Sequence, residues 1–137
     1  MSSAEGALQT AIYAVLTGDA ALTAIIGSDG VHDRLLNRTD MPYLIVGEMA
    51  ASDYGTDGDG GQEIQIVIEA WSSGAGHAEA QDMAGLVRGL LDDAALTLGD
   101  GFTLVSLLHR KTRLRRETKT RLHYAEMTFR AVVTGAQ

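Results

Sequence analysis

The chain contains no cysteine and one proline, and only 5% of its 137 residues are aromatic. The absence of cysteine excludes disulfide bonds, thiolate metal sites and cysteine nucleophiles. No apolar run approaches the roughly 18 residues that a membrane-spanning helix needs, and Met1–Glu5 lacks the composition of a signal peptide. We therefore expect a chain that is made and kept in a cytoplasm.

The length and composition predict a single globular domain over residues 1–137. The chain is long enough to bury a core without covalent staples. Its 45% apolar and 21% charged residues are ordinary values for a globular protein.

The spacing of apolar residues predicts three helices. Apolar side chains recur at helical spacing in Ser3–Thr17, and a short helix Ala20–Ile26 follows, with Asp19 as its N-cap and Gly27 at its end. The third helix is expected at about His77–Asp93, where the apolar residues again form one stripe.

The strands are predicted from alternation and from continuous apolar runs. An extended piece at Val31–Leu36 is followed by a buried strand at Tyr43–Met49. Apolar and polar residues alternate in Gln62–Trp71, and two segments, Phe102–Arg115 and Arg121–Thr134, form a long C-terminal hairpin. The order of elements predicts an α+β fold, with an antiparallel sheet of about four strands packed on one side by two or three helices.

The acidic, glycine-rich segment Ser52–Gly61 does not fit a calcium loop. When Gly60 is placed at position six of an EF-hand loop, Gly55 falls at position one and Ile66 at position twelve. The first ligand and the chelating glutamate are therefore both absent.

Other catalytic and cofactor patterns are equally incomplete. Gly74–Gly76 lies between a predicted strand and helix, but Glu79 stands where a dinucleotide loop needs a small residue, and its carboxylate would oppose a phosphate. There is no HExxH, GxSxG or SxxK pattern. The histidines are scattered, at His32, His77, His109 and His123. We predict no enzyme, no metal and no cofactor, with an active site assembled from distant residues as the alternative.

Positive charge is concentrated in one short window. Residues 110–121 hold seven of the eleven Lys and Arg residues and one acid, a net charge of +6, whereas the rest of the chain carries −13. In a strand, Lys111, Arg113 and Arg115 would share one face, and Arg110 and Arg116 the other. The window could bind phosphates, dock on an acidic protein surface, or simply protect a sheet edge. No aromatic residue lies within it, so stacking on bases is not expected.

The predicted interface residues of this basic hairpin are Arg110, Lys111, Arg113, Arg115, Arg116, Lys119 and Arg121.

The whole pattern resembles a known family. It comprises LQTAIYAVLTGDAALTAIIG, VHDRL, MPYLIVGE, the acidic loop, EIQIVIEAWSSGAGHAEAQDMAGLVRGLL and LHYAEMTFRAVV. This order resembles the tail completion or tail terminator proteins of long-tailed phages, in the branch also found in gene transfer agents. The resemblance covers nearly the whole chain, and its most specific parts are Pro42-Tyr43, the strand ending in Trp71, and the glycine-rich turn before the third helix.

The resemblance implies a structural role in a virion or phage-like particle assembled in the bacterial cytoplasm. Six copies would form a ring that caps the head-proximal end of the tail tube, stops its growth and offers a surface to the neck. DNA would pass through the hole, and neither catalysis nor a cofactor is implied. The alternatives are another neck component, such as a head–tail connector or stopper, or a non-specific nucleic-acid-binding module that uses the basic hairpin.

Charge and entropy give expectations for such a ring. A basic lumen would retain DNA, so acidic side chains are expected toward the hole or rim and the basic hairpin toward an acidic neighbour. Ala50–Gly61 cannot offset the entropy of ordering by itself, so we expect it to be mobile in the free chain and ordered on assembly. The residues expected to form this second interface are Asp53, Tyr54, Asp57 and Asp59.

Overall fold

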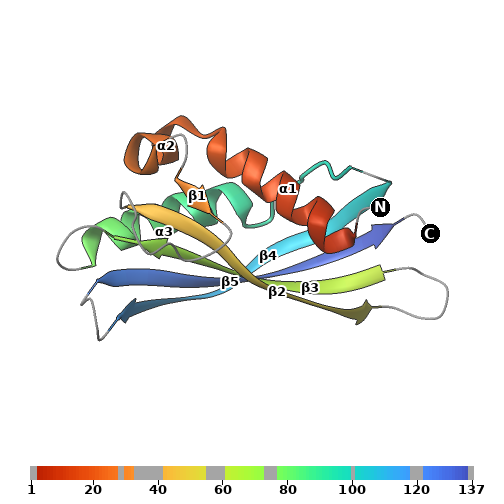
Figure 1. The fold of residues 1–137 in the computed structure, drawn as a ribbon. Coiled ribbons are helices and arrows are strands. Elements are labelled where there is room, and N and C mark those ends of the chain that lie inside the picture. Colours follow the sequence, from red (N-terminus) through yellow and green to blue (C-terminus); the bar gives the residue numbers. More distant parts are fainter. Residues whose placement is uncertain are drawn as a thin grey trace.

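The computed structural model describes residues 3–27, 30–32, 42–54, 61–72, 77–99, 101–117 and 122–135. Three helices lie on one face of a five-stranded sheet, so the predicted α+β class is confirmed (Figure 1). The elements are α1 (Ala4–Thr17), α2 (Ala20–Ile26), β1 (Val31–His32), β2 (Tyr43–Tyr54), β3 (Gly61–Trp71), α3 (Ala78–Leu91), β4 (Phe102–Arg116) and β5 (His123–Gly135).

The strand order is β1-β2-β3-β5-β4, and every pair is antiparallel except β1 with β2. The sequence predicted about four strands, and the additional one is β1, which lies within the extended piece expected at Val31–Leu36. This strand is very short. The backbone N–H of Leu44 donates to the carbonyl of Gly30 at 2.8 Å, which holds β1 beside the start of β2.

The first two helices begin at side-chain caps, of which the sequence predicted the second, Asp19. The Ser3 hydroxyl accepts a hydrogen bond from the backbone N–H of Gly6 at 3.0 Å, and the Asp19 carboxylate accepts one from Leu22 at 2.9 Å. Gly27 has a φ of 82°, a left-handed conformation that glycine adopts without strain. Among the described helices none alone is long and apolar enough to cross a membrane; α1 and α2 meet the criterion only as a pair bent by 84°.

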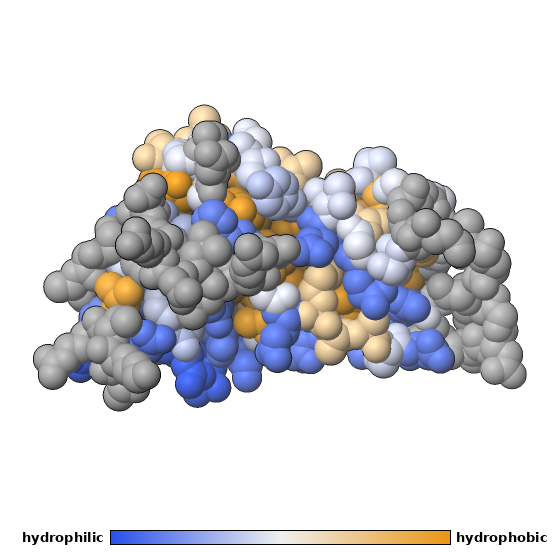
Figure 2. Space-filling view, viewed as in Figure 1, coloured by the Kyte–Doolittle hydropathy of each residue, from blue (hydrophilic) through white to orange (hydrophobic). Residues whose placement is uncertain are grey.

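The core lies between the sheet and the helices. The residues at alternating positions of β3 that face the helices, Ile64, Ile66, Ile68 and Ala70, are fully buried, as the alternation predicted. The opposite face of the sheet, which we call the open face, bears no described helix and carries polar residues such as Glu63, Gln65 and Thr128. Figure 2 shows hydrophilic side chains gathered along this lower side of the molecule.

The β2 strand is longer than predicted, which corrects the expectation of a mobile segment from Ala50 onward. Residues 50–54 continue the strand, with Asp53 opposite Gln62 and Tyr54 opposite Gly61. The small and acidic residues of this stretch have low strand propensity, but pairing with β3 supplies the backbone hydrogen bonds and decides the local structure. Asp57 and Asp59 lie outside the described residues.

Candidate interface surfaces

The basic residues lie along β4, which forms one edge of the sheet. Lys111, Arg113 and Arg115 pair with Thr128, Glu126 and Tyr124 of β5, so the three cations share the open face. Arg116 pairs with His123 and lies on the helix-bearing face. All residues from 110 to 116 are exposed, and Arg115 forms an ion pair with Glu126 at 3.5 Å. Lys119 and Arg121 lie outside the described residues.

A β-bulge changes the predicted position of Arg110. His109 lies opposite Phe129 and Lys111 opposite Thr128, so Arg110 is an extra residue in β4. Both Arg110 and Lys111 line a pocket on the open face. The expectation that Arg110 points to the opposite face is therefore wrong, because a bulge interrupts the alternation of side chains.

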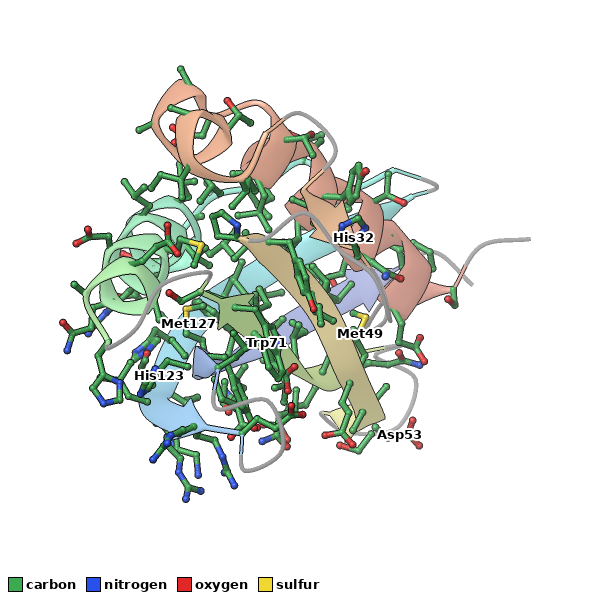
Figure 3. The ribbon with its side chains drawn as sticks, turned by 60° about the vertical axis from the view of Figure 1, so that its left-hand side comes forward. His32, Met49, Asp53, Trp71, His123 and Met127 are labelled. Atoms are coloured by element: carbon green, nitrogen blue, oxygen red, sulfur yellow. The ribbon has the colours of Figure 1, made fainter. Side chains whose placement is uncertain are left out.

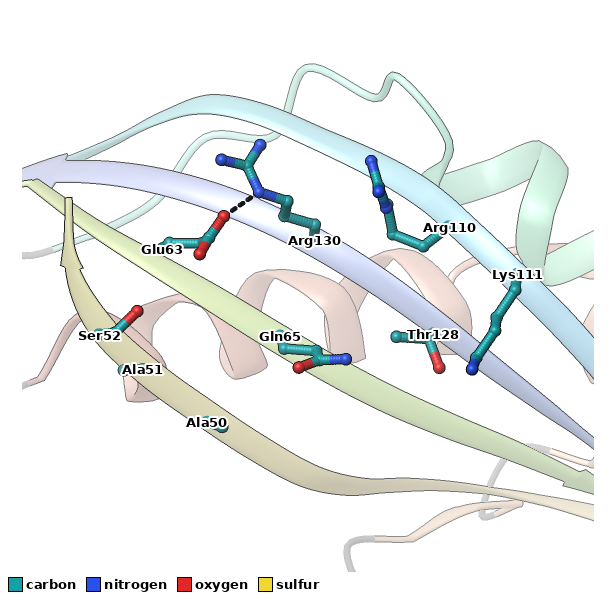
Figure 4. A pocket seen from close by; sticks show the side chains of 9 residues that line it. All are labelled: Ala50, Ala51, Ser52, Glu63, Gln65, Arg110, Lys111, Thr128 and Arg130. Atoms are coloured by element: carbon teal, nitrogen blue, oxygen red, sulfur yellow. Dashed lines mark hydrogen bonds and ion pairs between the residues drawn. The ribbon is translucent and has the colours of Figure 1, made fainter. Parts of the chain in front are cut away.

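This pocket crosses the open face from β2 to β4 and has a volume of about 560 Å³ (Figure 4). On the β2 side the pocket is lined by small side chains, and on the β4 side it is lined by the cations Arg110 and Lys111. Glu63 and Arg130 form an ion pair within it, so the charge of Arg130 is partly compensated. The lining residues are Ala50, Ala51, Ser52, Glu63, Gln65, Arg110, Lys111, Thr128 and Arg130. Within the described part of the chain, no group of three His, Asp or Glu side chains could hold a metal ion.

A second apolar cluster lies on the open face near the β4–β5 hairpin. Tyr43, Ile45 and Trp71 are buried there, with Leu122 and Tyr124 packed against them. The rings of Trp71 and Tyr124 are stacked, with centroids 4.2 Å apart and planes inclined by 11°. Trp71 also donates from Nε1 to a Glu69 carboxylate oxygen at 3.0 Å. The cluster therefore ties the hairpin to β2 and β3. Sequence reasoning missed it, although aromatic residues at the ends of three strands were a signal.

Two histidines meet at the start of α3. The rings of His77 and His123 pack edge to face with centroids 4.4 Å apart. Burial lowers the pKa of His123 from its ordinary value, and the nearby His77 and Arg116 lower it further. No described group bonds to its buried Nδ1 atom. These surroundings disfavour the protonated form of His123, which is labelled in Figure 3.

The other described histidine of the C-terminal hairpin, His109, lies in the middle of β4. Its backbone N–H donates to the Asp92 carboxylate at 2.9 Å, and burial and Arg88 lower its pKa. Glu79, which argued against a phosphate site, accepts a hydrogen bond from the Ser72 hydroxyl at 2.9 Å. The turn Gly74–Gly76 lies outside the described residues.

The chain is similar to a known protein family and to a chain of a solved structure. Residues 10–134 match the family model described as "Tail completion protein gp17". A chain in the structure described as "Virion of native gene transfer agent (GTA) particle" is similar, with 31% identity and a TM-score of 0.87, over 98% of this chain and 100% of that chain. None of the curated proteins compared with this chain matches it.

Proposed function

The chain belongs to the tail completion protein gp17 family, and from that premise we propose that it is a tail terminator. As a ring, which we take to contain six copies, it caps the head-proximal end of the tail tube, stops tube growth and joins the tube to the neck. It acts through its interfaces as a single domain over residues 1–137, without catalysis or a cofactor.

The observation that carries this proposal is the full-length similarity to a chain of an assembled particle. The match has a TM-score of 0.87 and covers 98% of this chain and 100% of that chain, so it is not confined to one motif. Relatives that share fold and length can share the surfaces with which they assemble, whereas a local match to one motif would support no such inference.

The charge distribution supports contact with acidic neighbours through β4. The strand offers five exposed cations, at Arg110, Lys111, Arg113, Arg115 and Arg116, while the chain as a whole has a net charge of −7. DNA can pass a predominantly acidic hole without being retained. We accordingly propose that Asp53, Asp57 and Asp59 lie toward the hole or rim, and that the basic side chains on the open face of β4, Lys111, Arg113 and Arg115, meet the tube or neck.

One test is a tube-capping assay. Purified chain added to growing tail tubes is expected to stop elongation and to appear as an end cap with a central hole in negative-stain images. Arg113→Glu combined with Arg115→Glu should weaken joining of the ring to the tube or neck, because it reverses charge at the proposed contact. Arg88→Glu is the matched control, since Arg88 is an exposed cation on α3. Tubes that elongate to the same length with and without the chain would contradict the terminator role.

Two other functions predict different results in the same assay. A connector or stopper would form a ring that binds completed tails or heads without limiting tube length. A nucleic-acid-binding module would bind duplex DNA in a strongly salt-dependent manner and would leave tubes unchanged.

A further inference from the structure

Described residues cover both edges of the sheet along only part of their length. At one edge, β1 pairs with β2 only at Leu44 and Ile45. At the other, the segment after α3 covers the middle of β4: Asp93 donates from its backbone N–H to the Leu107 carbonyl at 2.7 Å, and Asp92 accepts from the His109 N–H. No described residue pairs with the outer edge of residues 49–53 or of residues 112–116.

The outward-pointing groups of β4 follow from the hydrogen-bond pattern. Glu117 donates from its backbone N–H to the Leu122 carbonyl at 2.9 Å, so this pair is hydrogen-bonded across the hairpin. In an antiparallel ladder hydrogen-bonded and non-bonded pairs alternate. Arg113 and Arg115 therefore bond to β5. The backbone N–H and C=O groups of Thr112, Leu114 and Arg116 point away from the sheet.

The same argument applies to β2. Ser72 donates from its backbone N–H to the His123 carbonyl at 2.9 Å, so even-numbered residues of β3 bond to β5 and odd-numbered ones bond to β2. Ala50 and Ser52, which lie opposite Gln65 and Glu63, bond to β3. The backbone groups that point outward are those of Met49, Ala51 and Asp53.

We propose that the open part of β4 in one copy pairs with the open part of β2 in the next copy, so that one sheet continues from copy to copy around the ring. This pairing rests on the proposed ring. The sheet order and pairing make β2 and β4 antiparallel to each other within a copy. All copies in a ring with rotational symmetry have the same direction along the axis, so β4 and the neighbouring β2 meet as antiparallel strands.

Side-chain faces limit the registers of this contact to those that pair Leu114 with Met49, Ala51 or Asp53, and we propose the central one. Pairing Leu114 with Ala51 also pairs Thr112 with Asp53 and Arg116 with Met49. All six residues lie on the helix-bearing face of their own sheets, so the helices of every copy stay on one side of the continuous sheet. Leu114 is 37% exposed in the single copy, and the contact would cover it.

This register also staggers neighbouring copies. Arg113 aligns with Ile45 across its own sheet, through Glu126 and Glu69, and Ile45 lies well before Ala51 along β2. A sheet that closes on itself requires tilted strands and such a stagger.

The charges of the two edges favour this pairing over self-pairing of like edges. Lys111–Arg116 holds four cations, whereas residues 43–71 hold six acids and no Lys or Arg. Two β4 edges repel each other, which also protects the free chain against edge-to-edge aggregation. The contact of β4 with β2 is attractive because the two edges differ in charge. Contacts between two different surfaces of the same chain produce a ring when the rotation from each copy to the next adds up to a full turn.

Cysteine cross-linking tests the register, because the chain has no cysteine of its own. Leu114→Cys is combined in turn with Met49→Cys, Ala51→Cys and Asp53→Cys, with Ala50→Cys and Ser52→Cys as controls on the open face. The assembled species, either the ring in solution or the capped tube, is then oxidised. We expect a ladder of covalent multimers with cysteines at 114 and 51, and markedly less with either control.

A proline variant tests the pairing by an independent route. Leu114→Pro removes an outward N–H that makes no bond within the sheet, so the fold measured by circular dichroism should persist. Leu114→Ala keeps the N–H and is the control. Each contact between copies would lose one hydrogen bond, and the pyrrolidine ring of the proline would clash with the neighbouring strand. We expect assembly, as measured by sedimentation, to weaken by about tenfold or more.

The outcomes separate this pairing from the proposed function. A ring or cap that forms equally well with Leu114→Pro and gives no cross-link from position 114 to 49, 51 or 53 overturns the pairing alone. A chain that forms neither ring nor cap under any condition contradicts the proposed function and the pairing together.

Discussion

At the scale of single residues, Asp19 caps the start of α2 through one hydrogen bond. Its carboxylate satisfies the Leu22 N–H, which has no partner within the helix at that position. Asp19→Ala should therefore lower the free energy of unfolding by about 1 kcal/mol. Urea titration measures this loss. Asp19→Asn, which can still cap, should recover most of it, and equal losses in both variants would show that the charge matters more than the cap.

His123 predicts a pH dependence of stability. Its pKa is lowered in the folded chain below the ordinary value of 6.5, so the unfolded chain binds more protons between the two values. The contribution of neutral His123 to the free energy of unfolding is therefore fully present above pH 6.5, and it is lost as the pH falls through the pKa of the folded chain. His109, whose pKa is also lowered, contributes with the same sign.

The variant His123→Gln should have a flatter stability profile on the acidic side than the unmodified chain. Urea titrations between about pH 5 and pH 8 provide the comparison. Parallel profiles for the two proteins would mean that His123 is protonated equally in the folded and unfolded states.

At the scale of elements, β3 is the centre of the sheet, and its two faces differ in what they contribute. Ile66 is fully buried against the helices, whereas its neighbour Gln65 lines the open pocket. Ile66→Ala should lower the free energy of unfolding by about 2–5 kcal/mol, because it leaves a cavity in the core. Gln65→Ala should change it by no more than about 0.5 kcal/mol, so chemical denaturation of the pair tests the assignment of faces.

The same elements show what sequence reasoning could and could not reach. The strand around Ile66 was predictable because a period of two is a local signal. The continuation of β2 through Asp53 was not, because its pairing with Gln62 is a contact between strands that outweighs weak local propensity. The bulge at Arg110 was missed for a related reason: nothing in the residue itself marks the extra position, which appears only against Phe129 and Thr128 of β5.

The basic surface was found from composition, but its arrangement was not. Counting charges locates the window at 110–121, and simple alternation places Lys111, Arg113 and Arg115 together. The pocket that Arg110 and Lys111 share with Ala50–Ser52 depends on the order of strands, since these residues come from opposite edges of the sheet. Strand order is a property of the whole domain, which no local pattern encodes.

At the scale of the whole molecule, the separation of basic and acidic residues makes DNA binding a test between the tail terminator and the nucleic-acid-binding alternative. The net charge of −7 opposes association with phosphates, while the basic strand favours it. We expect any binding to duplex DNA at about 0.15 M salt to be weaker than the usual non-specific range of about 10⁻⁴ to 10⁻⁶ M. Fluorescence anisotropy across a salt series measures it.

A triple variant, Arg113→Glu, Arg115→Glu and Arg116→Glu, serves as the reference for that experiment. Tight binding by the unmodified chain that disappears in the triple variant would favour the nucleic-acid-binding alternative over the terminator.

The stacked pair formed by Trp71 and Tyr124 has a practical consequence for observing these events. Trp71 is the only tryptophan in the chain, so fluorescence excited at the red edge of protein absorption comes from one known position. Arg115 lies opposite Tyr124 on the neighbouring strand, within the basic edge. Docking along that edge should therefore alter the emission yield and rotational anisotropy of an indole that is already in place, and assembly could be followed in real time without attaching a dye.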